Sequence, residues 1–77
     1  MIGTPTASEN ITLSVNGAPR DIPRNSTVAE LLDSLKVDPR LVVIEHNRTI
    51  LRDRGAYASQ ELVSGDVVEI VHFVGGG

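Results

Sequence analysis

The chain lacks cysteine altogether, has only two aromatic residues, Tyr57 and Phe73, and contains no long apolar run among its 77 residues. Without cysteine it can form no disulfide, thiolate metal site or thiol nucleophile. A membrane-spanning helix needs ~20 apolar residues, so we expect no membrane partner. The first ten residues have neither a basic start nor an apolar stretch, which argues against a signal peptide. These absences predict a cytoplasmic protein.

Basic residues are also few: seven Lys and Arg stand against ten Asp and Glu, which gives a net charge of −3. A nucleic-acid site needs a clustered basic surface that releases counterions. Only Arg48, Arg52 and Arg54 lie close together in the sequence, and two aromatic residues are too few for a base-stacking platform. We therefore expect no nucleic-acid partner.

No set of catalytic or metal-binding residues can be recognised. Neither histidine, His46 or His72, has a carboxylate or hydroxyl neighbour at a catalytic or metal-ligand spacing in the sequence. Several acidic residues show no paired arrangement and are interpreted as solvated charges: Asp53, Glu61, Asp66 and Glu69. A domain this small cannot easily hold both a core and a deep cleft. The sequence favours a carrier or binding module, and a self-contained enzyme is the weakest alternative.

The first half of the chain predicts a hairpin followed by a helix. Apolar residues alternate from Ile11 to Val15, and Asn16-Gly17 favours a tight turn into a second strand that ends at Pro23. Thr27 and Glu30 have the spacing of a capping box. Apolar residues then recur at helical spacing, which predicts a helix from Val28 to Lys36.

The second half predicts three more strands: 41–46, 49–51 after a turn at 47–48, and 67–74 after a turn at 64–66. Residues 52–64 are expected to be irregular, with one helical turn near Tyr57. The first and last strands are the most apolar and suit the centre of the sheet. The fold class is therefore α+β, with one main helix across one face of a mixed four- to five-stranded sheet. The expected core is Leu13, Val15, Val28, Leu31, Leu32, Leu35, Val42, Ile44, Leu62, Val68 and Ile70.

The chain ends in three glycines, Gly75, Gly76 and Gly77, directly after the last predicted strand. We divide the chain into a disordered tail (1–9), a domain (10–74) and a flexible tail (75–77). Glycine has no Cβ, so such a tail can enter a narrow channel in extended form. From Val74 it reaches ~13 Å. Coupling of the terminal carboxylate to AMP would activate it, and a sulfur nucleophile could then displace AMP to leave a thiocarboxylate.

The run from Asn10 to Gly77 resembles the sulfur carriers of thiamine biosynthesis, the ThiS family, which have the β-grasp (ubiquitin-like) fold. The resemblance lies in four stretches: Val15-Asn16-Gly17, Ser26 to Leu32, Ser64 to Val71, and His72-Phe73-Val74-Gly75-Gly76-Gly77. The chain departs from the family at Asn47-Arg48, where Asn-Gly is common, and arginine tolerates a positive φ poorly. It also lacks a common proline at Leu51-Arg52-Asp53, is one residue longer over 54–58, and carries an extra tail at 1–9.

The resemblance implies a mechanism and a set of partners. A ubiquitin-activating-type adenylating enzyme, which itself uses ATP and Mg, would adenylate Gly77. A cysteine desulfurase or other persulfide donor would supply the sulfur, and thiazole synthase would receive it. The carrier is expected to bind no cofactor of its own and to be a monomer.

Other functions remain open from the residues alone. A related hypothesis is that the chain is a sulfur carrier for molybdopterin synthesis, tRNA thiolation or sulfur amino-acid assembly. A second class is a ubiquitin-like modifier joined to lysines through Gly77, and a third is an interaction domain with a passive tail.

Strand alternation also predicts a docking surface. Val68 and Ile70 should face the helix, whereas Val71 and Phe73 should face outward, beside Val74 and the tail. We predict that Val71, Phe73 and Val74 form the partner-binding patch, because exposed apolar clusters often mark interfaces. The alternative is that a loop covers them.

Overall fold

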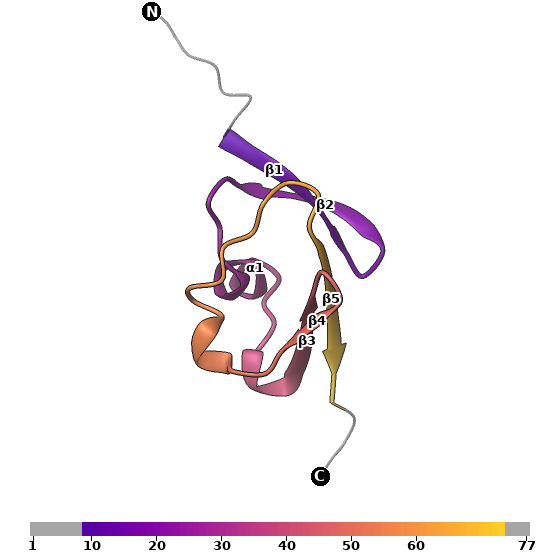
Figure 1. Ribbon diagram of the computed structural model, residues 1–77, viewed down its shortest axis with the longest axis vertical. Coiled ribbons are helices and arrows are strands. Elements are labelled where there is room, and N and C mark those ends of the chain that lie inside the picture. The colour runs from indigo at the N-terminus through magenta and orange to yellow at the C-terminus, as the bar shows by residue number, and fades with distance from the viewer. Residues whose placement is uncertain (1–8, 74–77) are drawn as a thin grey trace, which may run out of the picture.

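A computed structural model describes residues 9–73, in which five strands form one mixed sheet and a single α-helix packs across one of its faces (Figure 1). Residues 1–8 and 74–77 lie outside the described residues, and with them Val74, the predicted C-terminal tail and all of the predicted N-terminal tail except Glu9. The elements are β1 (Asn10–Val15), β2 (Ala18–Pro23), α1 (Val28–Ser34), the 3₁₀ turn η2 (Pro39–Leu41), β3 (Val42–His46), β4 (Thr49–Leu51), the 3₁₀ turn η3 (Arg54–Ala56) and β5 (Val67–His72). No helix within 9–73 is long and apolar enough to cross a bilayer.

The sheet has the strand order β2-β1-β5-β3-β4, so β1 and β5 lie inside it as predicted. β1 and β5 pair in parallel through only two residue pairs, and the other neighbouring strands are antiparallel. The side chain of Asn16 adds to the short parallel ladder, because its Oδ1 accepts from the N–H of Ile70 at 2.7 Å and its Nδ2 donates to the Ile70 carbonyl at 3.3 Å. Asn16 and Gly17 have φ angles of 51° and 85°, which suit the predicted hairpin turn.

The predicted capping box begins α1. Thr27 Oγ1 accepts from the N–H of Glu30 at 3.2 Å, and a carboxylate oxygen of Glu30 accepts from the N–H of Thr27 at 2.9 Å. The helix ends at Ser34, two residues before the predicted end at Lys36. Lys36 has a φ of 60°, and its N–H and that of Val37 bond back to the carbonyls of Asp33 and Leu32. This pattern satisfies the last helical carbonyls and turns the chain out of the helix.

The core between α1 and the sheet contains nine of the eleven predicted residues, together with two that were not predicted, Ile22 and Tyr57. Val15 and Leu35 only pack against it from its margin. Tyr57 is 3% exposed and lies in the predicted helical turn. Its carbonyl accepts from the N–H of Ala29 at 2.9 Å, so this turn supports the start of α1. At the other chain end, Glu9 is already placed, and its carbonyl accepts from the N–H of Arg24 at 2.8 Å.

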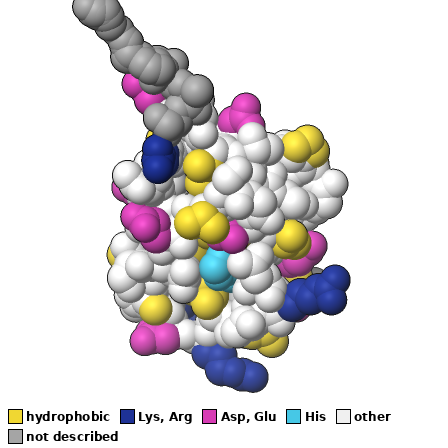
Figure 2. Space-filling model, turned by 45° about the horizontal axis from the view of Figure 1, so that its top comes forward, with side chains coloured by type: hydrophobic (Ala, Val, Ile, Leu, Met, Phe, Trp, Pro, Cys, Tyr) yellow, Lys and Arg dark blue, Asp and Glu magenta, His cyan; other side chains and the backbone are white. Residues whose placement is uncertain are grey.

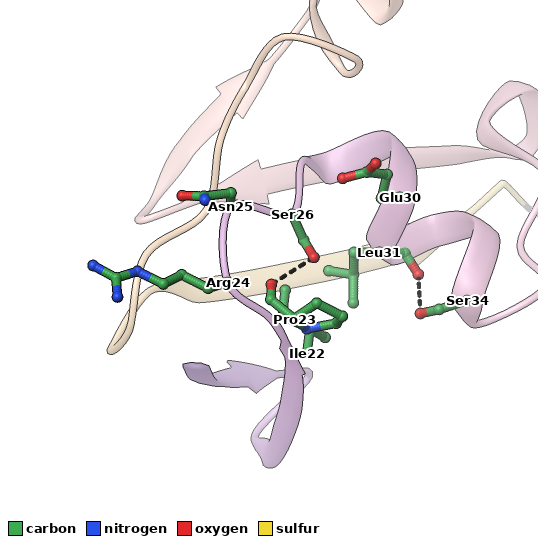
Figure 3. Close-up of a pocket in the computed structure, with 8 residues that line it drawn as sticks. All are labelled: Ile22, Pro23, Arg24, Asn25, Ser26, Glu30, Leu31 and Ser34. Carbon is green, nitrogen blue, oxygen red and sulfur yellow. Dashed lines mark hydrogen bonds between the residues drawn. The ribbon is translucent and has the colours of Figure 1, made fainter. Parts of the chain in front are cut away.

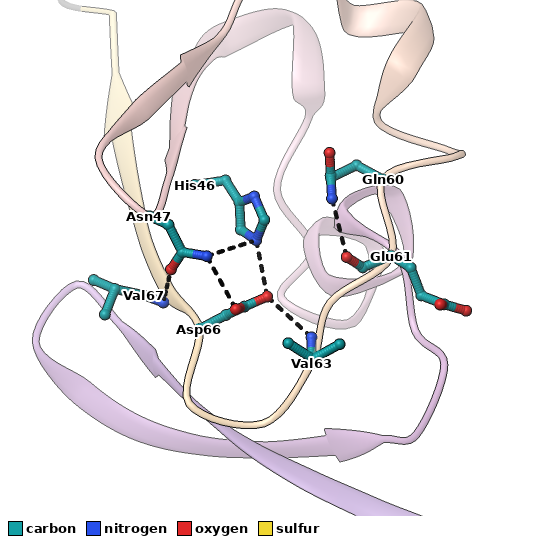
Figure 4. Close-up of polar contacts among 7 residues, drawn as sticks. All are labelled: His46, Asn47, Gln60, Glu61, Val63, Asp66 and Val67. Atoms are coloured by element: carbon teal, nitrogen blue, oxygen red, sulfur yellow. Dashed lines mark hydrogen bonds and ion pairs between the residues drawn. The ribbon is translucent and has the colours of Figure 1, made fainter.

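The β3–β4 turn has two residues with positive φ, Asn47 at 52° and Arg48 at 72°. Arg48 takes this unfavourable conformation because Asn47 anchors the turn through three hydrogen bonds to Asp66 and Val67, and Figure 4 shows the two that its side chain makes. The N–H of Asn47 donates to the carbonyl of Val67 at 2.7 Å, and its Oδ1 accepts from the N–H of Val67 at 2.8 Å. Its Nδ2 donates to Asp66 Oδ1 at 3.0 Å. The arginine in place of glycine therefore leaves the hairpin turn intact.

Asp66 is the centre of a polar cluster, which corrects two expectations from the sequence. It is only 6% exposed and is not a solvated charge, and its Oδ2 lies 2.8 Å from Nε2 of His46, which therefore does have a carboxylate partner. Asp66 Oδ2 also accepts from the N–H of Val63 at 2.9 Å. Burial raises the pKa of Asp66, but the hydrogen bonds from Asn47, His46 and Val63 outweigh it and lower the pKa overall. The carboxylate thus joins the β3–β4 turn to the turn before β5.

We expect Asp66→Asn to lower the free energy of unfolding by ~1–3 kcal/mol at pH 7, because it leaves buried donors without their charged acceptor. Since the pKa of Asp66 is lowered by folding, its stabilisation is present above the unfolded-state pKa of ~3.9 and is lost as the pH falls through the folded-state pKa. Urea unfolding from pH 7 to pH 2 should therefore show a difference between wild type and Asp66→Asn that shrinks in acid.

The control is Asp33→Asn, which removes the same charge from an exposed helical residue whose side chain makes no hydrogen bond or ion pair within residues 9–73. Its effect at pH 7 should be small. A pH-independent deficit in Asp66→Asn would contradict the proposed role of the carboxylate charge.

Candidate functional site

The last strand presents different chemistry on its two faces. Val68 and Ile70 are buried against the core, whereas Val67, Val71 and Phe73 are 39%, 57% and 54% exposed. The alternation predicted for β5 is confirmed, and no described loop covers Val71 and Phe73. Val74, Gly75, Gly76 and Gly77 lie outside the described residues. The structure therefore places two exposed apolar side chains immediately before the predicted reactive tail.

Two further residues on the outer face of the sheet extend this apolar surface. Val43 pairs directly with Val71 across β3 and β5, so the two side chains share a face. Ile50 of β4, which is 43% exposed, lies opposite Glu45 of β3. Glu45 is two residues from Val43, so Ile50 and Val43 lie on the same face of the sheet. Beside them is a shallow pocket of about 370 Å³, lined by Val42, Val43, Ile50, Leu51, Arg52, Arg54, Tyr57 and Phe73. We call Val43, Ile50, Val71 and Phe73 the outer patch.

Charges of opposite sign lie at the two ends of the outer patch. Glu45 and Glu69 are directly opposite each other on β3 and β5, on the outer face. Like charges in this position repel, so the pair contributes nothing favourable to the sheet. Arg52 and Arg54 line the pocket beside Phe73, toward the end of β5. The outer face is thus acidic over the middle of β5 and basic where the strand ends.

Another pocket, of about 350 Å³, lies between the end of β2 and α1 (Figure 3). Both of its serines already have local partners: Ser26 Oγ donates to the carbonyl of Pro23 at 2.6 Å, and Ser34 Oγ donates to that of Leu31 at 2.7 Å. Glu30 is used by the capping box. Pro23 pairs with Asn10 at the start of β1, far from the end of β5. This pocket offers no nucleophile or acid–base set beside the tail.

Neither histidine lies in a metal-type cluster, since no group of three or more His, Asp or Glu side chains in the described chain could hold an ion. The polar pair of His46 and Asp66 has side chains that are 16% and 8% exposed. Figure 2 shows a histidine at the surface beside an acidic side chain, with hydrophobic side chains around it. His72 is exposed at the end of β5. The arrangement around His46 fits a structural hydrogen bond that holds two turns together.

The sequence predicted part of this site and missed part of it. It identified Val71 and Phe73, because alternation along a single strand assigns a face to each residue. It missed Val43 and Ile50, because their place beside Val71 depends on the register between strands. It also missed the Arg54 side chain, whose guanidinium carbon lies 5.8 Å from the centre of the Phe73 ring.

Comparison with known proteins places this chain among relatives of similar sequence. The sequence profile of the ThiS family matches residues 13–77. A protein named sulfur carrier protein ThiS, from Bacillus subtilis, is 43% identical over 51 residues, which are 66% of this chain and 76% of the relative. Proteins named thiazole synthase from Magnetococcus marinus and Paramagnetospirillum magneticum are 35% and 42% identical over 65 residues. These are 84% of this chain but only 20% of each relative, so the chain spans about a fifth of their length.

Solved structures show the same architecture. The crystal structure of the thiamine biosynthesis protein ThiS from Geobacter metallireducens matches 87% of this chain and 100% of its own, with a TM-score of 0.75 and 37% identity. The solution structure of a thiamine biosynthesis protein from the same organism has a TM-score of 0.71 and 38% identity, over 87% of this chain and 88% of its own. The open five-stranded sheet with one helix is a β-grasp fold, and the chain belongs to the ThiS family.

Proposed function

We propose that this chain is a sulfur carrier of thiamine biosynthesis, acted on by partner enzymes, and that its reactive group is the carboxylate of Gly77. The observation that carries the proposal is the family match, which runs from residue 13 to the last glycine. The outer patch supports it, because exposed apolar residues directly before the tail provide a surface on which a partner can dock. Carrier function also suits a small domain whose described pockets hold no recognisable catalytic set.

The proposed chemistry takes place in partners. A carboxylate oxygen of Gly77 attacks the α-phosphate of ATP, pyrophosphate leaves, and an acyl adenylate forms on the activating enzyme, which holds the ATP and Mg. The terminal sulfur of a persulfide donor, such as a cysteine desulfurase, attacks the acyl carbon and releases AMP. A thiol then cleaves the sulfur–sulfur bond, which leaves a thiocarboxylate on Gly77 and a disulfide on the thiol side.

Thiazole synthase is the proposed acceptor of this sulfur. Two relatives with that name contain a region similar to 65 residues of this chain, and this region makes up 20% of each. A carrier-like region within a protein named for the synthase supports a functional pairing of the two. The cytoplasm, where ATP and thiols are available, is the proposed location.

We further propose that the outer patch docks on the activating enzyme while the tail enters its nucleotide site. A tail of four residues reaches ~13 Å beyond Phe73, so the domain can stay outside the site. The charges around the patch suit a partner surface that is acidic near the tail channel and basic opposite Glu45 and Glu69. Such complementarity orients a complex and speeds its formation.

We predict that Val71→Asp and Phe73→Asp each weaken binding to the activating enzyme by about tenfold or more, because a buried charge at an interface core is costly. Calorimetric titration of the enzyme would measure the dissociation constants, and circular dichroism would check the fold. Val63→Asp is the matched control, since Val63 is 58% exposed and lies in the irregular segment before β5, outside the patch. Equal weakening by all three variants would show that the outer patch is not the docking surface.

We predict that removal of Gly77 abolishes thiocarboxylate formation although Gly76 still ends in a carboxylate. One residue spans ~3.5 Å, which exceeds the tolerance for attack on the α-phosphate. Gly77→Ala should impair activation more than stability, because the added methyl group meets the channel and not the core. Purified activating enzyme, ATP, a persulfide donor and carrier would be incubated and read by intact mass. Replacement of one oxygen by sulfur identifies the carrier, and mass-shifted protein conjugates would identify a modifier.

The chain that ends at Gly76 provides the decisive comparison. Normal sulfur loading of that chain would rule out Gly77 as the reactive residue.

A further inference from the structure

Arg54, the first residue of η3, reaches across the end of the sheet to contact three other segments. Its Nε donates to the carbonyl of Pro39 at 2.8 Å, and its Nη2 donates to the carbonyl of Val42 at 3.2 Å. Its guanidinium carbon lies 5.8 Å from the centre of the Phe73 ring, within cation–π range. One exposed side chain therefore connects η3, η2, the start of β3 and the last described residue.

These contacts surround the backbone hydrogen bond that ties Phe73, the last described residue, to the sheet. The N–H of Phe73 donates to the carbonyl of Leu41 at 2.9 Å, and Leu41 lies between the two residues whose carbonyls Arg54 holds. By holding Pro39 and Val42, Arg54 fixes the peptide groups on both sides of that acceptor. By lying against the Phe73 ring, it also limits movement of the donor residue.

The geometry requires an arginine. A planar guanidinium offers several N–H groups in a rigid fork, so it can bond two carbonyls and still present its face to a ring. A lysine ammonium is a single point charge and would reach one of these partners at a time. Holding so long a side chain in one conformation on an exposed surface costs conformational entropy, which its contacts must offset.

We propose that Arg54 is a positioning residue for the activation of Gly77: it fixes the point at which the tail leaves the sheet. This inference rests on the proposed function. A tail that is fully extended in a partner's channel has no slack, so any displacement of Phe73 relative to the outer patch is passed on to the terminal carboxylate. A misplacement of ~1 Å at the reacting atoms can lower a rate by up to ~100-fold.

The test compares wild type with Arg54→Gln and Arg54→Lys as substrates of the purified activating enzyme, with ATP-dependent adenylate formation as the assay. We expect both variants to lower kcat by about tenfold or more and to leave KM within about twofold, because docking through the outer patch is retained while alignment is lost. The matched control is Arg20→Gln, which removes the same charge from an exposed residue of the edge strand β2, outside the outer patch and its pocket. This control should keep the wild-type kcat. Arg52→Gln serves as a charge comparison, because Arg52 lines the pocket beside Phe73 as Arg54 does.

A second measurement tests the anchor without any enzyme. Amide hydrogen exchange followed by NMR should be faster for the N–H of Phe73 in both Arg54 variants. The N–H of Ile70, bonded to Asn16, should be unchanged and serves as an internal reference. Thermal unfolding would confirm that the domains remain folded under assay conditions.

The outcomes separate this inference from the proposed function. Wild-type kcat in Arg54→Lys, or unchanged Phe73 exchange in both variants, would overturn the positioning role alone. A raised KM with unchanged kcat, shared by Arg54→Gln and Arg52→Gln, would replace it with a simple charge contact to the partner. If the wild-type chain itself forms no adenylate, the proposed function fails and this role in it fails too.

Discussion

The structure depends on the position of β5, which lies in the centre of the sheet and also leads to the C-terminus. Val68 and Ile70 are buried against the core on one face of this strand, while Val71 and Phe73 are exposed on the other. A strand in this position is held by a neighbour on each side, β1 and β3. The residues that stabilise the domain and the exposed residues of the outer patch therefore alternate along a single strand.

β5 is held by a five-pair antiparallel ladder with β3 on one side and by a short ladder, supplemented by side chains, on the other. Its parallel pairing with β1 covers two residue pairs, so Asn16 supplements it with two bonds to Ile70. Asn47 does the same for Val67 from the other neighbouring hairpin. In both cases an asparagine with positive φ ends a strand and turns its amide toward β5. Asparagine tolerates this conformation and still carries a donor and an acceptor, which explains its use in both turns.

The polar groups and the outer patch have different physical roles. The carboxylate of Asp66 is buried and fully used by three hydrogen bonds, so it stabilises a pair of turns. The charges on the outer face, by contrast, include a directly opposed pair of glutamates, Glu45 and Glu69, which weakens the sheet. An unfavourable pair beside exposed apolar residues is understandable if a partner surface covers it. The outer face therefore agrees with the carrier role better than with that of an isolated domain.

The sequence by itself determined the local features of this protein. The capping box, the Asn16-Gly17 hairpin, the alternation of β5 and the glycine ending are each encoded within a few adjacent residues, so they can be read directly. The same is true of the family resemblance, because it rests on the order of such short stretches. The end of α1 at Ser34 was harder to predict from the sequence, because it depends on the positive φ of Lys36, which hydrophobic periodicity does not reveal.

Only the tertiary structure decided which distant residues meet. His46 and Asp66 are 20 positions apart, Asn16 and Ile70 are 54 apart, and Arg54 reaches carbonyls 15 and 12 positions earlier in the chain. Such contacts follow from strand register and from the path of the irregular segment after β4. A shift of one residue in register would turn every side chain of a strand to the opposite face. For this reason Ile50 and Val43 join Val71 and Phe73 only in the folded domain, and Arg54 reaches Phe73 only there.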